Sequence, residues 1–165
     1  MMTRCCDESY KARKPTYSDC TVCEDWHNYQ NFAEWHEENY PKDCGIYCLD
    51  KDLKVIGNKL YSPEMCMYVS NGVNAFITDS GKSRGIHPIG VTMTKYGKFI
   101  SRCSNPITNT SDYLGTFNSE NLAHLAWRKR KSKIAELLIQ ASIREDEKLG
   151  LANYKYALDN FKIHA

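Results

Sequence analysis

The stretch from Leu49 to Asn74 constrains the fold of this chain more than any other part of the sequence. It holds an acidic pair, Asp50 and Asp52, a Gly57-Asn58 dipeptide near its middle and an asparagine at its end. A Gly-Asn dipeptide is typical of a tight turn, and carboxylate and amide oxygens are the hard ligands that Mg²⁺ prefers. The pattern therefore predicts a small motif that gathers oxygen ligands around one divalent cation.

The local signals around this stretch predict the order strand, turn, strand, helix. Residues 44–49 can form a first strand, the Gly57-Asn58 turn follows, and residues 60–61 can form the return strand. Ser62 then suits a helix N-cap, with Pro63 in the first helical position. The helix that follows would bring Asn74 back toward the acidic pair.

A helix is also expected ahead of this motif, between Asp19 and Asn39. Asp19 suits its N-cap, and Pro41 would end it. Apolar side chains recur inside it at three- and four-residue steps: Cys23, Trp26, Tyr29, Ala33 and Trp35 or His36. A stripe at this spacing is typical of a helix face that packs into a core.

Charge is distributed unevenly along the 165 residues. Residues 1–80 contain 8 Lys/Arg against 13 Asp/Glu, residues 81–165 contain 14 against 7, and the total is +2. Between residues 82 and 134, only Asp112 and Glu120 oppose the basic side chains. A basic unit joined to a mildly acidic one favours a polyanion-binding module, and the aromatic residues among the charges favour nucleic acid. A solvated charged face is the alternative.

The second half of the chain predicts a three-stranded sheet followed by a helix. The runs 87–94, 97–102 and 112–117 are each bounded by Gly, Asn or Pro, which is typical of short strands. Asn118 or Ser119 suits the N-cap of a long helix with a leucine-rich apolar face.

The expected fold class is α+β, and the chain divides into four parts. We expect a metal-finger domain over residues 1–77 and a small, polar linker over 78–86. A sheet-and-helix domain would follow over 87–148, and a helical tail over 149–165. The tail could pack on the sheet, mediate self-association or clamp DNA.

Asp50-Lys51, Gly57-Asn58-Lys59 and Asn74 together resemble the motifs of phage HNH homing endonucleases, which are ββα-metal (His-Me finger) nucleases. The flanking similarity lies in segments 21–26, 31–32, 49–52 and 61–64, and the resemblance covers most of residues 4–148. It implies that Asp50 and Asn74, with Asn71 as second choice for the amide, bind Mg²⁺ or Mn²⁺. It also implies that Asn58 fixes the hairpin.

Position 51 carries lysine where HNH nucleases usually carry a catalytic histidine. The resemblance thus assigns Lys51, Asp50 and Asn58 to the catalytic site. A neutral imidazole suits proton abstraction near neutral pH, whereas an ammonium group suits phosphate binding. If Lys51 anchors phosphate, then Asp52, His36 or His87 would be the alternative proton acceptor.

The domain over residues 87–148 resembles Apetala-type DNA-binding domains, which also occur in phage HNH nucleases. The matching pieces are Gly90-Val91, Gly97-Lys98-Phe99 and residues 113–117. In that family the sheet enters the major groove. The resemblance implies DNA contacts from Lys95, Lys98, Arg102, Arg128, Lys129 and Lys131, with Thr92, Thr94 and Ser101 as polar helpers. For Arg128, Lys129 and Lys131, a solvated helix face is the alternative. The alternation of side chains along the strands does not decide which face of the sheet would contact DNA.

The eight cysteines are expected to be thiols of a protein in a reducing compartment. A structural Zn²⁺ bound by Cys20, Cys23, Cys44 and Cys48 is one reading of their spacing. Ordinary buried thiols are the reading that we favour, because both pairs precede Asp50 and the second pair has three intervening residues.

These features predict a phage-encoded endonuclease of the bacterial host cytoplasm. It would bind double-stranded DNA and act as a nickase, hydrolysing one phosphodiester in a divalent-metal-dependent reaction. The alternative is a catalytically impaired relative that binds DNA or inhibits a host protein. No apolar run approaches the roughly 20 residues of a membrane span, and residues 1–14 are too polar for a secretory signal. A monomer and a dimer are both compatible with the sequence.

Overall fold

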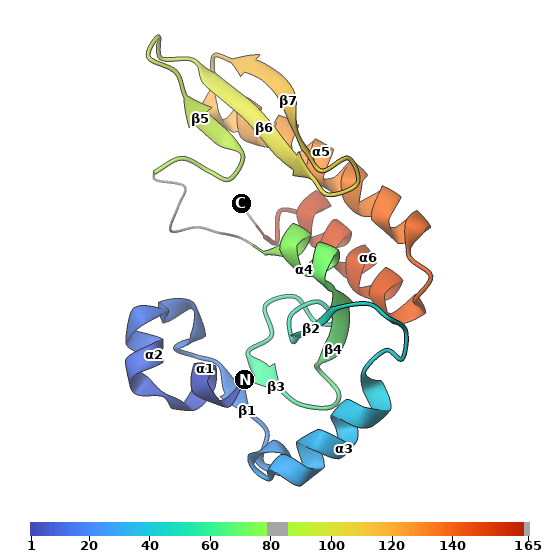
Figure 1. The fold of residues 1–165 in the computed structure, drawn as a ribbon. Coiled ribbons are helices and arrows are strands. Elements are labelled where there is room, and N and C mark those ends of the chain that lie inside the picture. Colours follow the sequence, from blue (N-terminus) through green and yellow to red (C-terminus); the bar gives the residue numbers. More distant parts are fainter. Residues whose placement is uncertain (79–85, 164–165) are drawn as a thin grey trace. The chain divides into compact units, whose positions relative to one another are not determined.

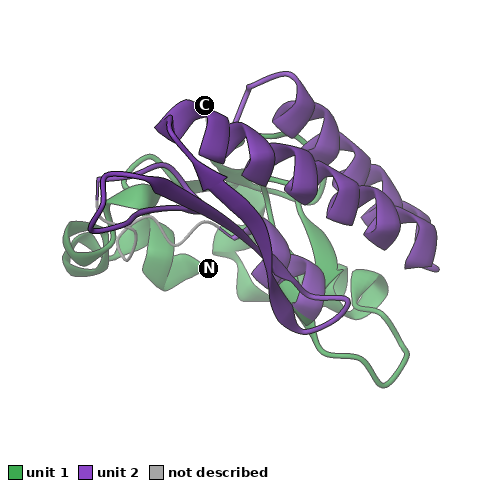
Figure 2. Cartoon of the chain, turned by 90° about the horizontal axis from the view of Figure 1, so that it is seen from above, with its two compact units in different colours: residues 1–71 green, residues 72–165 purple. Residues whose placement is uncertain are grey.

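The structure, a computed structural model, describes residues 1–78 and 86–163 and mixes helices with small sheets (Figure 1). The α+β class expected from the sequence is confirmed. The chain forms two compact units, unit 1 over residues 1–71 and unit 2 over residues 72–165 (Figure 2). Of the linker predicted over 78–86, residues 79–85 lie outside the described part of the chain.

Unit 1 is built from short elements. They are α1 (Met2–Cys6), α2 (Glu8–Arg13), η1 (Pro15–Tyr17), β1 (Thr21–Val22), η2 (Glu24–His27), α3 (Tyr29–Asn39), β2 (Tyr47–Asp50), β3 (Leu60–Tyr61) and β4 (Met67–Ser70). Their core contains Cys5, Cys20, Trp26, Tyr61 and Cys66, all buried. Leu53 and the β4 residues Met67, Tyr68 and Val69 are buried as well.

The helix predicted from Asp19 begins later than expected. Residues 21–22 form β1, residues 24–27 form the single 3₁₀ turn η2, and α3 begins only at Tyr29. The side chain of Asn28 accepts a hydrogen bond from the backbone N–H of Gln30 and caps the helix. The consequence for the predicted stripe is that Trp26 is buried, whereas Tyr29 is 71% exposed.

The predicted strand pairing is wrong in one respect. β2 pairs antiparallel with β4, with Asp50 opposite Met67 and Tyr47 opposite Ser70. The expected return strand β3 instead pairs parallel with β1. Residues 67–69 are all buried, and a run of Met, Tyr and Val suits a buried strand better than a helix. A strand, a second strand and a helix still follow one another as β2, β4 and α4 (Asn71–Ile77), but residues 51–66, which include β3, lie between β2 and β4.

The helix predicted to start at Ser62 is a turn. The backbone N–H of Met65 and that of Cys66 donate to the Ser62 carbonyl at 3.2 and 2.9 Å, and the chain then enters β4. The helix begins after that strand, as α4 (Asn71–Ile77), with Val73 and Phe76 buried. The Ser-Pro signal thus produces one turn of local structure and no more.

Unit 2 contains the predicted sheet and its helices. After α4 come β5 (Val91–Met93), β6 (Phe99–Asn105), β7 (Thr110–Phe117), α5 (Glu120–Ala141) and α6 (Glu145–Asp159). The sheet is antiparallel in the order β5-β6-β7, and α5 packs along one face of it (Figure 1). α6 packs against α5, so the predicted tail belongs to a helical layer rather than to the sheet. In the described part of the chain, no helix is long and apolar enough to cross a membrane.

The sheet and α5 approach closely at Gly90. A Cβ atom at this position would lie 2.0 Å from Cδ1 of Trp127, and Gly90 has a φ of +80°. Only glycine suits both conditions, because it has no side chain and reaches positive φ without strain. Trp127 and the glycine backbone thereby fix how α5 sits on the sheet.

Candidate functional sites

Asp50 stands at the end of β2 and organises the start of the long loop. Its Oδ1 atom accepts hydrogen bonds from the backbone N–H groups of Asp52 and Leu53, at 2.9 and 2.7 Å. Burial raises the pKa of this carboxyl above its ordinary value. Because Oδ1 receives both bonds, Oδ2 is the atom through which Asp50 could bind a further group.

Lys51 and Asn58 brace the loop from both sides. The buried Lys51 side chain donates from Nζ to the Asn58 carbonyl at 2.9 Å and to Oδ1 of Asp52 at 2.6 Å. In return, Nδ2 of Asn58 donates to the Lys51 carbonyl at 2.8 Å. The Lys51 ammonium group is thus bound inside the loop by a carbonyl and a carboxylate, and it stabilises the loop.

Asn58 also fixes the entry to β3. Its Nδ2 atom donates to the Leu60 carbonyl at 2.7 Å, and its Oδ1 atom accepts from the Leu60 N–H at 3.2 Å. Together with the bond to Lys51, one amide side chain satisfies three backbone groups. These bonds hold the chain beside the turn predicted at Gly57-Asn58. In that turn, the Asn58 N–H donates to the Val55 carbonyl at 3.0 Å and Gly57 has a φ of +82°.

The proposed metal ligands lie in different units. Asp50 belongs to unit 1 and Asn74, on α4, to unit 2, so their convergence on one cation stays a prediction. The alternative amide, Asn71, belongs to unit 1, and its Oδ1 atom accepts from the Cys48 thiol at 3.8 Å. Within residues 1–78 and 86–163, no three His, Cys, Asp or Glu side chains form a group that could hold a metal ion.

Asp50 by itself fits a hard cation. Its Oδ2 is an anionic oxygen at a fixed position, because the two backbone bonds to Oδ1 hold the carboxylate. Such an oxygen is the ligand type that Mg²⁺ takes, usually beside several waters.

The histidines named as alternative proton acceptors have partners: Nδ1 of His36 lies 2.6 Å from the Tyr68 hydroxyl, and Nδ1 of His87 lies 2.5 Å from Glu120.

The cysteines named for zinc do not form a cluster. Cys20 is buried, Cys44 is exposed, and Cys23 and Cys48 are half-buried. The four do not bring three thiols together anywhere in the described residues. All eight cysteines of the chain are free thiols.

The face of the β5-β6-β7 sheet that α5 leaves uncovered is the second candidate site, here called the outer face. In β6, Ser101, Cys103 and Asn105 are buried, while Arg102 and Ser104 are exposed. This settles the facing that the sequence left open. The strand residues of the outer face are Thr92, Ile100, Arg102, Ser104, Ser111, Tyr113 and Thr116.

The hairpin between β5 and β6 adds two exposed lysines beside this face. Oγ1 of Thr94 accepts from the backbone N–H groups of Tyr96 and Lys98, at 3.3 and 3.1 Å, and shapes the turn. Lys95 and Lys98 are exposed, and the Lys95 ammonium lies 5.0 Å from the centre of the Tyr96 ring. Lys98 donates to the side chain of Asn118. Thr94 therefore supports the turn.

Two predicted DNA contacts on α5 are buried and need correction. Arg128, 3% exposed, donates to the carbonyls of Leu158 and Ile163. Lys131, 6% exposed, donates to the Phe76 carbonyl at 2.5 Å and lies 3.7 Å from that ring's centre. These cations hold helix ends inside unit 2, so they do not form a phosphate-contacting surface. Lys129, between them, is exposed.

The carboxylate that lies within the strands of the sheet, Asp112, is not on the outer face. Asp112 is opposite Cys103 on the inner side of the sheet and accepts from Nε of Arg130 at 2.8 Å. Among the outer-face residues of β5, β6 and β7, which the structure describes in full, there is no carboxylate. The face consequently carries positive charge from Arg102 with Lys95 and Lys98 at its edge.

Sequence reasoning did not assign Tyr113, which is 58% exposed on this face. Gly115 could have signalled it, because a glycine inside a strand often marks a bulge that changes the alternation of faces. Ser101 lies opposite Gly115 and Arg102 opposite Tyr113, with a register shift between Ser101 and Arg102.

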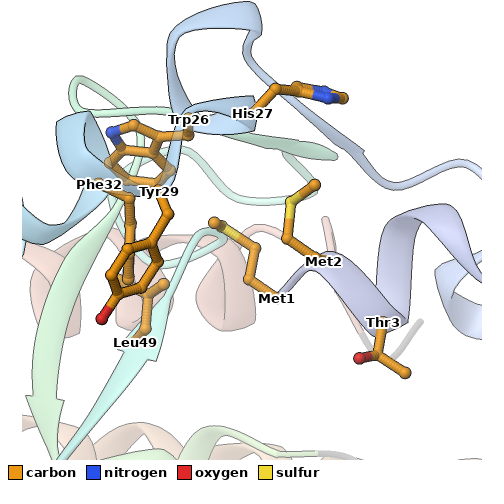
Figure 3. Close-up of a pocket in the computed structure, with 8 residues that line it drawn as sticks. All are labelled: Met1, Met2, Thr3, Trp26, His27, Tyr29, Phe32 and Leu49. Atoms are coloured by element: carbon orange, nitrogen blue, oxygen red, sulfur yellow. The ribbon is translucent and has the colours of Figure 1, made fainter.

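Unit 1 also contains a pocket of about 460 Å³. Figure 3 shows Trp26, Tyr29 and Phe32 on one side of it and the Met1 and Met2 side chains on the other. Its lining is largely apolar and is separate from the loop that Lys51 and Asn58 brace.

Comparison of the chain with known protein families, with characterised proteins and with solved structures found no match.

Proposed function

We propose that this protein binds duplex DNA through the outer face of the β5-β6-β7 sheet. The observation that supports this most is an uncovered sheet face that carries Arg102, is edged by Lys95 and Lys98, and has no carboxylate. Phosphate neutralisation by such side chains supplies most of the affinity of DNA-binding proteins. A two-stranded or three-stranded β-surface can also enter the major groove.

The basic residues divide into two roles under this proposal. Lys95 and Lys98 would contact phosphates, because they stand on an exposed hairpin at the edge of the face. Arg102 would face base edges, because its strand position is near the middle of the face, between β5 and β7. Arg128 and Lys131 take no part, since both are buried in internal hydrogen bonds.

A duplex-binding titration tests the proposal. Fluorescence anisotropy with a labelled duplex of about 20 base pairs, over a series of salt concentrations, should give a linear fall of log affinity with log salt. Arg102→Ala should weaken binding at least about fivefold, and Lys95→Ala should make the slope shallower by about one. Lys133→Ala is the matched control, because Lys133 is exposed on α5 and its partner is Glu136. Equal affinity of Arg102→Ala and the wild type, or no duplex binding at all, would overturn the proposal.

Metal-dependent nicking is the second candidate function. The loop braced by Asn58 and the fixed carboxylate of Asp50 favour it. Asp50 and Asn74 would hold the cation, and a bound Mg²⁺ would supply charge stabilisation at the scissile phosphate. The internal bonds of Lys51 favour a reduced activity, because its ammonium group is committed to Asp52 and to the Asn58 carbonyl.

A plasmid assay separates the two candidates. If the nuclease proposal holds, supercoiled DNA should relax with Mg²⁺ or Mn²⁺ in the presence of the wild type and stay supercoiled with Asp50→Ala. A wild type that is inactive while Lys51→His nicks would identify a DNA-binding relative that has lost its base. Identical relaxation by the wild type and Asp50→Ala would remove Asp50 from the reaction.

A further inference from the structure

Tyr113 is held in a defined position although it is exposed. Its hydroxyl forms a hydrogen bond with Oγ1 of Thr116 at 2.8 Å. The guanidinium carbon of Arg102 lies 5.9 Å from the centre of its ring. These contacts act on different parts of the side chain, so the ring is fixed at both its hydroxyl and its face while 58% of the residue stays exposed.

A bulge in β7 makes this arrangement possible. Tyr113 and Thr116 are three positions apart, and in a regular strand their side chains would point to opposite faces. The extra residue lies at Leu114, between the Tyr113–Arg102 and Gly115–Ser101 pairs. Gly115, with a φ of +127°, accommodates the bend. The bulge therefore directs the ring, its hydroxyl partner and the arginine to the same side of the sheet.

We propose that Tyr113, together with Arg102, is a stacking platform for an unpaired nucleobase in a single-stranded segment of DNA. The inference rests on the proposed function, because it requires the outer face to bind nucleic acid. An immobilised aromatic ring loses little freedom on binding, and every base offers a flat π-face to it. In a duplex those faces are covered by neighbouring bases, so the platform selects single-stranded or unstacked segments.

The residues around the Tyr113 ring suit the binding of single-stranded DNA. Arg102 and the two hairpin lysines supply positive charge, and the outer face has no carboxylate to repel phosphates. Thr116, which bonds the Tyr113 hydroxyl, is small, and 58% of Tyr113 stays exposed. Charge complementarity and an accessible aromatic face are the two features that sequence-tolerant single-strand binding requires.

The test compares one oligonucleotide as a single strand and as a blunt duplex, by anisotropy at fixed salt, with the full chain. Tyr113→Ala should weaken single-strand binding by about 5- to 100-fold. It should weaken duplex binding by a clearly smaller factor, because the ring lies on the duplex-binding face but does not stack on paired bases. Tyr113→Phe keeps the ring and should retain single-strand affinity to within about fivefold. Tyr156→Ala is the matched control, because Tyr156 is a similarly exposed tyrosine, 57%, on α6.

Each outcome decides a different claim. Unchanged single-strand binding by a folded Tyr113→Ala variant, with duplex binding intact, overturns the platform and leaves the proposed function standing. Equal losses for both DNA forms also overturn it, because the ring would then contact the duplex. Absence of binding to either form by the wild type overturns both proposals.

Discussion

Lys51 and Asn58 each donate a side-chain hydrogen bond to the other's main-chain carbonyl. The distances are 2.9 Å from Lys51 Nζ to the Asn58 oxygen and 2.8 Å from Asn58 Nδ2 to the Lys51 oxygen. This reciprocal pair closes the loop that contains the turn at Gly57. It also explains how a lysine can occupy a buried position, since its charge is compensated by Asp52 and a carbonyl dipole.

Removal of the Asn58 amide should destabilise unit 1. Asn58→Ala deletes three hydrogen bonds to backbone groups and is expected to lower the free energy of unfolding by about 2–3 kcal/mol. Urea unfolding followed by circular dichroism measures this. Asn39→Ala, which removes one exposed bond to the Trp35 carbonyl, should cost less than about 0.5 kcal/mol. Similar losses for the two variants would contradict the role of Asn58 as a brace.

Two glycines with positive φ should respond differently to alanine. Gly90→Ala places a Cβ 2.0 Å from Trp127 and should cost more than about 3 kcal/mol, because the packing of α5 on the sheet must shift. Gly97→Ala has open space around it and should cost about 1 kcal/mol, from backbone strain alone. Thermal unfolding of both variants gives the comparison; an equal cost would show that Trp127 does not restrict position 90.

Neighbouring cations on α5 should differ sharply in their contribution to stability. Arg128→Ala leaves the carbonyls of Leu158 and Ile163 without their buried donor and is expected to cost about 2–4 kcal/mol. Lys129→Ala changes an exposed side chain and should stay within about 0.5 kcal/mol. Chemical denaturation of both proteins checks this. If Lys129→Ala proved the more damaging variant, the assignment of Arg128 as an internal brace would be wrong.

Thiol reactivity should divide the cysteines into groups. Cys6 and Cys44 are exposed, whereas Cys5, Cys20, Cys66 and Cys103 are buried. Burial raises the pKa of Cys66 to about 12 and that of Cys103 to about 11, so their reactive thiolates are scarce. With a thiol reagent at pH 8, the thiols of Cys6 and Cys44 should react fast, and the four buried thiols should react only after unfolding. Rapid reaction of all eight in the native protein would contradict the described burial.

The same two thiols predict the sign of a pH dependence. Their folded-state pKa values lie above the ordinary value of 9.0. The unfolded chain therefore releases these protons first as the pH rises. Their contribution to stability is complete below about pH 9 and is lost as the pH rises toward 11–12. Between pH 8 and pH 10.5, the denaturation midpoint should fall further for the wild type than for Cys66→Ala. An equal fall in the two proteins would show that Cys66 does not cause the pH dependence.

Local signals in the sequence determined the elements of unit 2 well. The three strands and the α+β class follow from turn residues and alternation. α5 begins directly after the predicted Ser119, although the Ser119 side chain makes no capping hydrogen bond. These features act over a few residues, so one sequence is sufficient to predict them. The bonds of Asn58 also reach no further than seven positions along the chain. However, only the turn at Gly57-Asn58 and a role for Asn58 in fixing the hairpin were predicted.

Only the tertiary structure decided which strand pairs with β2, which face of the sheet is open, and which cations are buried. β2 could pair with residues 60–61 or 67–70 on local propensity, and the buried run from Met67 to Val69 selected the second. Arg128 and Lys131 look like surface charges in the sequence, yet their partners lie 30 or more positions away. Strand pairing, face selection and burial are settled by contacts between segments far apart in the chain, where local patterns carry little information.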